Sequence, residues 1–278
     1  METTVLRSIA SMLCLLFLVM IPKPVLSAAP EKTSLETVTD VRLTVLFDNM
    51  PFDERLETGW GFSCLVECPD TTILFDTGAD GSILMGNMEK LSIDPAVVDC
   101  VVLSHIHGDH VDGLKSFLSR NGEVDVYVPV SFPDDFKKKA EEYGCSIVDV
   151  SAPRRICRGV YSTGEIGTDI IEQSLVLRTA KGTIVITGCA HPGIAGIVEK
   201  AAGLYGKPVL LVMGGFHLGQ TSEKDVRNII TRLRKAGMVH GAPTHCTGEA
   251  AISTFRKELD DDFVNVGVGG VISLEDIE

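Results

Sequence analysis

The stretch Ser104-His105-Ile106-His107-Gly108-Asp109-His110 decides how this sequence is interpreted. It places three of the seven histidines of the chain, and one aspartate, within six residues. The apolar run at 99–103 before it predicts a strand, and a helix is expected to begin near Asp109. Because side chains alternate along a strand with a period of two, we expect His105 and His107 to point to the same side.

This combination of side chains is typical of a metal site. At the start of the expected helix, Asp109 and His110 would aim a carboxylate and an imidazole at a point next to the two strand-end imidazoles. Four such ligands suit two divalent ions side by side, and zinc is the first choice for an imidazole-rich site, with manganese and iron as alternatives. A chance run of polar loop residues is the competing interpretation, and three histidines in six residues weigh against it.

Three more histidines have similar settings. His191 in GCAHPG, His217 in GGFHLG and His245 in PTHCTG each follow a strand-like run. Ligands gather at the carboxyl ends of strands in layered α/β folds, so these three residues are further candidates for the same site. Only His240 lacks such a setting, and we interpret it as an ordinary surface or core residue.

Strand-like runs recur along the chain, and several are rich in Val, Ile and Leu without alternation, which indicates strands buried on both faces. Helical patterns follow in each half of the chain. This order predicts two sheets covered by helices, an α/β fold of the four-layer αββα sandwich type in a single domain. The expected strands are 41–47, 62–67, 72–76, 99–104, 124–129, 174–179, 182–187 and 208–213, and the expected helices are 131–144, 222–237 and 247–260.

Composition narrows the class of protein. The chain has 278 residues, of which 45% are hydrophobic and 23% are charged, so it is neither disordered nor fibrous. Its net charge of −13 argues against nucleic acid as a partner. A local metal cluster can still reverse this field at one site, so acidity does not exclude an anionic substrate.

The N-terminus resembles a secretion signal. Residues 9–21 are thirteen uncharged, mostly apolar residues, a length that suits a signal peptide better than a membrane span. Small residues at Ser27 and Ala28 favour cleavage between them. We therefore expect a signal peptide at 1–27, an extension at 28–40 and one domain at 41–278. The mature protein would be exported, periplasmic or extracellular, and free of the membrane; an uncleaved N-terminal anchor is the alternative.

Seven cysteines would remain after cleavage, and the odd number leaves at least one unpaired within the chain. Cys64 and Cys68 lie on one expected strand, where their side chains are too far apart to form a disulfide. We interpret most of the cysteines as small buried hydrophobic residues. Cys189 and Cys246 lie beside candidate ligands and are also interpreted as packing residues, because neither has an evident base. Disulfide pairing stays open.

The motifs resemble those of a known family. The pattern HxHxDH after a strand, FDTG at 75–78 and a later histidine at a strand end are similar to the metallo-β-lactamase superfamily, over about residues 41–270. GEI at 164–166, GCAHPGI at 188–194, GGFHL at 214–218 and PTHCTG at 243–248 resemble a subgroup related to 7,8-dihydropterin-6-yl-methyl-4-(β-D-ribofuranosyl)aminobenzene 5'-phosphate synthase. The resemblance implies the αββα fold with a metal centre at the edge of the sandwich.

The resemblance also implies roles for individual residues. Asp76 would be a carboxylate that orients a ligand histidine, although a plain turn aspartate in the FDTG corner fits the sequence equally well. Asp109 would bind the second metal and orient the nucleophile. The implied ligand sets are His105, His107 and His191 for the first metal, and Asp109, His110 and His245 for the second.

One departure from the family pattern concerns the second metal. Many dinuclear relatives carry an aspartate that bridges the two ions, whereas residues 213–219 read MGGFHLG, and Gly215 stands in that place. His217 is therefore either a metal ligand or substrate contact, or an imidazole that only supports the ligands. We expect the second metal to be held more weakly than the first.

The function expected from this site is that of a metal-dependent hydrolase, in which metal-activated hydroxide attacks an ester, lactone, thioester or phosphoester. Two alternatives stay open, a transferase of the pterin-synthase kind and a metal-dependent binding protein without turnover. The partner is a small-molecule substrate, whose identity the sequence leaves open together with the oligomeric state. Residues 48–62 are the expected wall of the site, where Phe52 and Trp60 either contact a flat ligand or simply pack.

Overall fold

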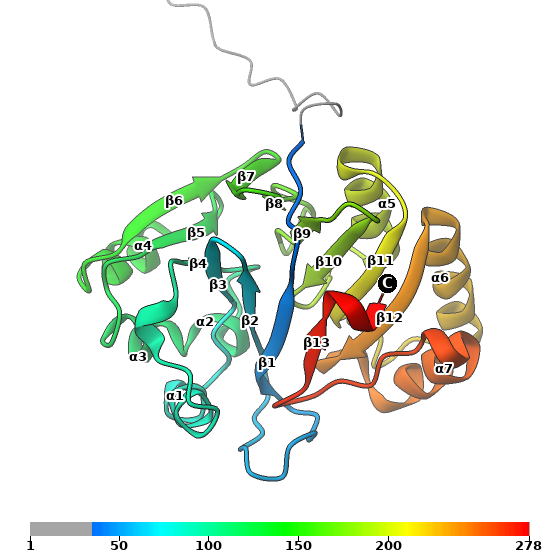
Figure 1. The fold of residues 1–278 in the computed structure, drawn as a ribbon, viewed down its shortest axis with the longest axis horizontal. Coiled ribbons are helices and arrows are strands. Elements are labelled where there is room, and N and C mark those ends of the chain that lie inside the picture. Colours follow the sequence, from blue (N-terminus) through cyan, green and yellow to red (C-terminus); the bar gives the residue numbers. More distant parts are fainter. Residues whose placement is uncertain (1–34, 278) are drawn as a thin grey trace, which may run out of the picture.

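The computed structural model describes residues 35–277, in which two β-sheets lie face to face between two layers of helices (Figure 1). The first sheet has the strand order β13-β1-β2-β3-β4-β5-β6, and β3 to β6 run parallel to one another. Its strands are β1 (Arg42–Asp48), β2 (Phe62–Cys68), β3 (Thr71–Phe75), β4 (Cys100–Val102), β5 (Asp125–Pro129), β6 (Ser146–Val150) and β13 (Val271–Ser273).

The second sheet has the order β12-β11-β10-β9-β8-β7, in which β10, β11 and β12 are parallel and the other pairs are antiparallel. Its strands are β7 (Arg154–Cys157), β8 (Val160–Ser162), β9 (Leu175–Arg178), β10 (Thr183–Thr187), β11 (Val209–Gly215) and β12 (Met238–Thr244).

Helices cover the outer face of each sheet, and this completes the four layers. On the first sheet lie α1 (Gly81–Lys90), α3 (Leu114–Leu118) and α4 (Asp134–Glu141), while α2 (Gly108–Val111) follows β4 directly. On the second lie α5 (Ile194–Tyr205), α6 (Glu223–Ala236) and α7 (Glu249–Leu259). Short 3-10 helices occupy Pro95–Val97, His245–Thr247, Asp260–Asp262 and Leu274–Ile277.

The apolar core has three layers, one between the sheets and one under each layer of helices. Val45 and Ile73 of the first sheet belong to the same buried cluster as Leu177 and Ile184 of the second. Strands in both sheets therefore bury both faces, which explains why their sequences are apolar without alternation.

Local signals explain where the helices begin and end. In α6 the Ser222 side chain accepts a hydrogen bond from the backbone N–H of Asp225, and Gly237 ends the helix in the left-handed conformation. Val226, Ile230 and Leu233 are spaced at three and four residues and are buried against the sheet. The α6 range agrees with the sequence prediction within one residue at each end.

All eight predicted strands are present, and the predicted helices at 131–144, 222–237 and 247–260 correspond to α4, α6 and α7. The first of these is shorter than predicted, because Pro133 forms its N-cap and the helix begins only at Asp134. The sequence analysis gave no range for β6, β7, β8, β12, β13, α1, α3 and α5.

Residues 1–34, which contain the predicted signal peptide and most of the extension, lie outside the described residues. Residues 35–40 pack on the second sheet, where the Val38 N–H donates to the carbonyl of Arg178 at 2.8 Å. Within residues 35–277, no helix is long and apolar enough to cross a membrane.

Candidate metal centre

The candidate residues meet at one edge of the sandwich because each of them follows the carboxyl end of a strand. Neighbouring parallel strands end on the same side of a sheet, so the loops after them converge. Asp76 follows β3, the segment 104–110 follows β4, Cys189 and His191 follow β10, His217 follows β11, and His245 follows β12.

His105, His107 and His191 form the first group of candidate ligands. Each offers one ring nitrogen, and these atoms lie within 4.8 Å of one another. Nε2 of His105 is 3.2 Å from Nδ1 of His107, and both rings lie within 5 Å, centroid to centroid, of the His191 ring. All three residues expected to hold one metal are therefore adjacent in space.

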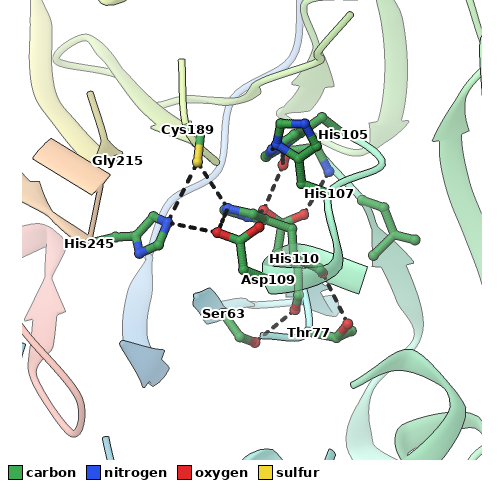
Figure 2. A network of polar contacts seen from close by, with 12 residues as sticks. Ser63, Thr77, His105, His107, Asp109, His110, Cys189, Gly215 and His245 are labelled. Atoms are coloured by element: carbon green, nitrogen blue, oxygen red, sulfur yellow. Dashed lines mark hydrogen bonds and ion pairs between the residues drawn. The ribbon is translucent and has the colours of Figure 1, made fainter. Parts of the chain in front are cut away.

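Asp109, His110 and His245 form a second group, which also contains Cys189. An Asp109 carboxylate oxygen lies 3.6 Å from Nε2 of His110 and 3.5 Å from Nε2 of His245. The Cys189 sulfur lies 3.1 Å and 3.5 Å from the same two nitrogens (Figure 2). The sequence interpretation of Cys189 as a packing residue does not account for this position among the ligand atoms.

Asp76 fixes the ring of His110 through the Nδ1 atom. The Asp76 carboxylate is fully buried, accepts hydrogen bonds from the backbone N–H and the hydroxyl of Ser104, and lies 2.7 Å from Nδ1 of His110. With Nδ1 engaged in this way, Nε2 is the nitrogen that faces Cys189 and Asp109. Such an oxygen partner fixes the tautomer and orientation of a metal-binding histidine.

Glu172 fixes the ring of His191 in the same way, through the Nδ1 atom. The sequence analysis did not predict a role for this residue. Its buried carboxylate accepts hydrogen bonds from the backbone N–H groups of Ala190 and His191, and it also contacts Nδ1 of the His191 ring. The available signal was an acid three residues before the apolar strand at 175–178. Glu172 lies before β9, which is antiparallel to β10, so it reaches the same edge of the sheet.

Asn49 holds the third ring. The Nδ1 atom of His245 lies 2.7 Å from Oδ1 of Asn49, whose side-chain amide donates in turn to the His245 carbonyl at 3.1 Å. His105 has the Ser104 hydroxyl 2.9 Å from its Nδ1. Four candidate ligand rings therefore have one nitrogen held by an oxygen atom, which leaves the other nitrogen directed into the centre.

The protonation states of three of these residues suit metal binding. Burial, together with the neighbouring imidazoles, lowers the pKa of His105, and burial lowers the pKa of His245 to about 4. Burial opposes ionisation of Asp109, but a hydrogen bond with His245 and the charge of His110 bring its pKa to about 2. Near neutral pH this carboxylate is charged and these two imidazoles are neutral, which is the form that binds a cation.

The backbone at this edge is strained. Asp76, Ala190, His217 and His245 have φ angles between 45° and 59°, in the left-handed region that residues other than glycine rarely adopt. Strain of this kind concentrates at functional sites, where the surrounding structure holds it in place. The turn at Ala190 directs Cys189 to the second group of ligands and His191 to the first.

His217 lies beside the first group and is exposed to solvent. Its ring centroid is 4.3 Å from that of His191. It also forms a third group with Cys189 and Cys246, whose ligand atoms lie within 4.8 Å of one another. The geometry thus places His217 at the mouth of the site, where it can contact a substrate or a metal.

Gly215 cannot be replaced by a bridging carboxylate without a shift of the backbone. A Cβ atom at this position would lie 2.4 Å from the carbonyl oxygen of Gly188 and 2.8 Å from the Cys246 sulfur. The absence of a bridging aspartate at Gly215 is therefore matched by the packing around it, because the Gly188 carbonyl and the Cys246 sulfur occupy the space that its side chain would need.

Replacing Gly215 by alanine tests this packing. We expect Gly215→Ala to lower the free energy of unfolding by about 1–3 kcal/mol, because the added methyl group overpacks a closed space. Gly219→Ala is the matched control in the same loop, since its Cβ would meet nothing nearer than 3.8 Å. Urea denaturation of both variants measures the difference, and equal stabilities would show that the space at Gly215 is open.

The segment 48–62 borders the site through two residues, Asn49 and Trp60, which both contact His245. Trp60 is 59% exposed, and its ring centroid lies 5.0 Å from that of His245. Phe52 is 50% exposed, so neither side chain serves core packing. Beside the first group of ligands, a cavity of about 580 Å³ is lined by the loop 166–170 together with His191, Pro192 and His217.

Comparison with known proteins identifies relatives across this chain. The family model of the metallo-beta-lactamase superfamily matches residues 61–199. A 7,8-dihydropterin-6-methyl-4-(beta-D-ribofuranosyl)-aminobenzene-5'-phosphate synthase of Methanocaldococcus jannaschii is 29% identical over an alignment of 261 positions, which covers 76% of this chain and 89% of the relative. An uncharacterised protein of the same organism is 28% identical, over 84% of this chain and the whole relative.

Solved structures show the same architecture. A metal-dependent hydrolase of the beta-lactamase superfamily superposes with a TM-score of 0.71 at 26% identity, over 84% of this chain and 98% of that structure. The short form of human tRNase Z superposes with a TM-score of 0.54 at 14% identity, over 84% and 99% of the two chains, and shows the fold alone. The matching family model and the shared αββα architecture establish that this chain belongs to the metallo-β-lactamase superfamily.

Proposed function

We propose that this protein is a metal-dependent hydrolase of an ester, lactone, thioester or phosphoester. The observation that carries the proposal is the pair of ligand groups at one edge, His105, His107 and His191 beside Asp109, His110 and His245. The relative of known structure at 26% identity, described as a metal-dependent hydrolase, supports it.

The donor set fits divalent metal. Imidazole nitrogens with one carboxylate suit zinc first and manganese or iron next, and the two groups provide places for two ions. When bound, such ions polarise a carbonyl or phosphoryl oxygen and supply a nucleophile from water near neutral pH.

The residues of this chain provide position and charge for that chemistry. The carboxylate of half-buried Asp109 faces the Nε2 atoms of both His110 and His245, so it can hold the nucleophile in line as well as bind the metal. Glu172 and Asp76 fix the rings of His191 and His110. His217, exposed at the mouth, can donate a hydrogen bond to the substrate.

The shape beside the ligands suits a small molecule. The cavity at 166–170 opens next to His191 and His217. Beside the second group of ligands, the exposed side chain of Trp60 next to His245 offers a surface for a flat group. A small organic substrate with a flat portion, placed between these walls, is the substrate that we propose.

The second candidate is a transferase that joins a dihydropterin to an aromatic amine, as the name of the synthase at 29% identity suggests for that relative. The flat surface of Trp60 would suit such a substrate as well. The two functions differ in outcome: a hydrolase releases product with water alone, whereas the transferase requires both substrates.

A substrate panel tests the proposal. We expect the purified protein to hydrolyse at least one of a set of aryl phosphodiesters, lactones and thioesters, and to lose this activity when a chelator removes its metal. Added zinc or manganese should restore it. Metal-bearing protein that is inactive on the whole panel but forms product from a dihydropterin and an aromatic amine would contradict the hydrolase and establish the transferase.

We also propose that the protein is exported, on the strength of the apolar run at 9–21 and the small residues after it. Export also weakens the case for the transferase, because pterin synthesis is a cytosolic kind of reaction. Fractionation of native cells tests this. A processed form in the periplasm or medium is expected, and a full-length cytosolic form would refute export.

A further inference from the structure

We propose that the thiolate of Cys189 is a ligand of the second metal, together with Asp109, His110 and His245. This inference rests on the proposed function, because it assumes that the ligand groups bind metal. It assigns the place left by the missing bridging carboxylate to a sulfur atom from a different loop, the turn after β10 instead of the end of β11.

The position of the sulfur is the first argument. It lies 3.1 Å from Nε2 of His110 and 3.5 Å from Nε2 of His245, and those are the nitrogens left available when Asp76 and Asn49 hold the other side of each ring. Figure 2 shows the sulfur above the two rings, with Asp109 between them. A cysteine that serves only as a packing residue would be buried among apolar side chains. The Cys189 sulfur instead faces the available nitrogens of two candidate ligands.

The second argument is that Gly215 leaves no room for the usual ligand. A side chain there would collide with the Gly188 carbonyl and with Cys246. Gly188 directly precedes Cys189, so the backbone that closes the space at Gly215 also brings the Cys189 sulfur to the ligands. The backbone at Gly188 thus accounts both for the absence of a carboxylate at Gly215 and for the position of the Cys189 sulfur.

The third argument is that the turn is held in this shape. Ala190 adopts a left-handed φ of 59°, and the Glu172 carboxylate accepts the N–H groups of Ala190 and His191. The same carboxylate contacts the His191 ring. One buried acid therefore fixes the direction of Cys189 into the second group and of His191 into the first.

The chemistry balances without a redox partner. When the metal binds, the S–H bond of Cys189 breaks, the metal–sulfur bond forms, and the proton leaves to solvent. A cation next to a thiol favours the thiolate strongly enough to overcome burial. Thiolate, imidazole and carboxylate together are a donor set that zinc accepts.

Cys246 is the natural control because its sulfur is also nearby. It is half-buried, its sulfur lies 3.6 Å from the Cys189 carbonyl oxygen, and it is grouped with His217 instead of Asp109 and His110. If a thiolate binds the second metal through the Asp109 group, loss of Cys189 must matter and loss of Cys246 must not.

Cobalt substitution tests the assignment without using activity. The metal-depleted full-length protein is titrated with Co²⁺, and a thiolate ligand produces a sulfur-to-cobalt charge-transfer band in the near ultraviolet. We expect the band in the wild type and in Cys246→Ser, and its loss in Cys189→Ser. We also expect Cys189→Ser to weaken binding of the second Zn²⁺ by at least about tenfold.

The outcomes separate the inference from the proposed function. Cobalt that binds to the wild type without the band refutes the thiolate ligand and leaves the metal centre standing. A protein that binds no metal refutes the proposed function itself. A band that survives in Cys189→Ser, or that disappears in Cys246→Ser, overturns the assignment to Cys189. If both variants fail to fold, as circular dichroism would show, the wild-type spectrum still decides whether a thiolate binds.

Discussion

His107→Ala is expected to abolish hydrolysis of any substrate that the panel identifies, while the protein remains folded. The Nδ1 atom of His107 is 3.2 Å from Nε2 of His105, so the substitution removes one member of the first ligand group. Losing even a residue that merely orients a ligand costs about 10–100-fold in metal affinity or activity, so the loss of a ligand should cost about 100-fold or more. Turnover measured at saturating substrate, without added metal, checks this.

The fold should tolerate the change because His107 is half-buried and lies in a loop at the edge of the sandwich. We expect the free energy of unfolding of the metal-free protein to change by about 1 kcal/mol or less. His240→Ala is the matched control, since His240 is also half-buried but lies on β12, 3.7 Å from Asp262 and outside both ligand groups. Equal activity in the two variants would contradict the assignment of His107.

Asp76→Ala is expected to reduce both stability and metal affinity. The Asp76 carboxylate is buried and lies 2.7 Å from Nδ1 of His110, so its removal leaves this buried ring nitrogen without its carboxylate partner. Burial opposes the charged form of His110, yet the charge of Asp76 raises its pKa. Breaking a buried pair costs about 3–5 kcal/mol. Urea denaturation in the presence of a chelator measures this cost apart from the metal.

Two comparisons make the Asp76 result interpretable. Asp80→Ala removes a nearby aspartate that caps α1 and should cost only about 1 kcal/mol. Asp76→Asn keeps the shape of the side chain but cannot accept hydrogen bonds with both side-chain atoms, so it should lose metal affinity by about 10–100-fold with a smaller loss of stability. If Asp76→Ala is no less stable than Asp80→Ala, Asp76 is only a turn residue.

Much of the fold was predictable because most of its strands are recognisable in the sequence as apolar runs. Buried parallel strands such as 182–187 and 208–213 are continuous apolar runs, and the α6 segment carries a Ser cap, an apolar stripe and a Gly stop. The edge strands β6 and β7 were missed since they are short, half-exposed and rich in polar residues. Helix α1 was missed because its sequence GSILMGNMEK contains two glycines.

The site was predictable where its residues are close together in the sequence. The segment 104–110 supplies four of the candidate ligands from a single strand end, so the spacing alone indicated metal. Predicting His191 and His245 as ligands required a further argument, namely that the carboxyl ends of neighbouring parallel strands lie at the same edge of a sheet. These two residues follow strands of the second sheet, whereas residues 104–110 follow a strand of the first, so their contact depends on how the two sheets pack together.

Glu172 and Asn49 were not predictable in the same way. Their roles depend on hydrogen bonds to His191 and His245 across long stretches of chain, and a single glutamate or asparagine in a loop carries no pattern. The position of Cys189 was not predictable for a related reason: beside a histidine it looks like any small buried residue, and only the structure shows its sulfur next to Nε2 of His110 and of His245.

The metal content of the purified full-length protein tests the central claim most directly. Elemental analysis after extensive dialysis should find between one and two equivalents of zinc, manganese or iron per chain, with the second held more weakly. The content should fall in His107→Ala and stay unchanged in His240→Ala. Less than one equivalent in the wild type, or the same content in wild type and His107→Ala, would contradict the metal centre.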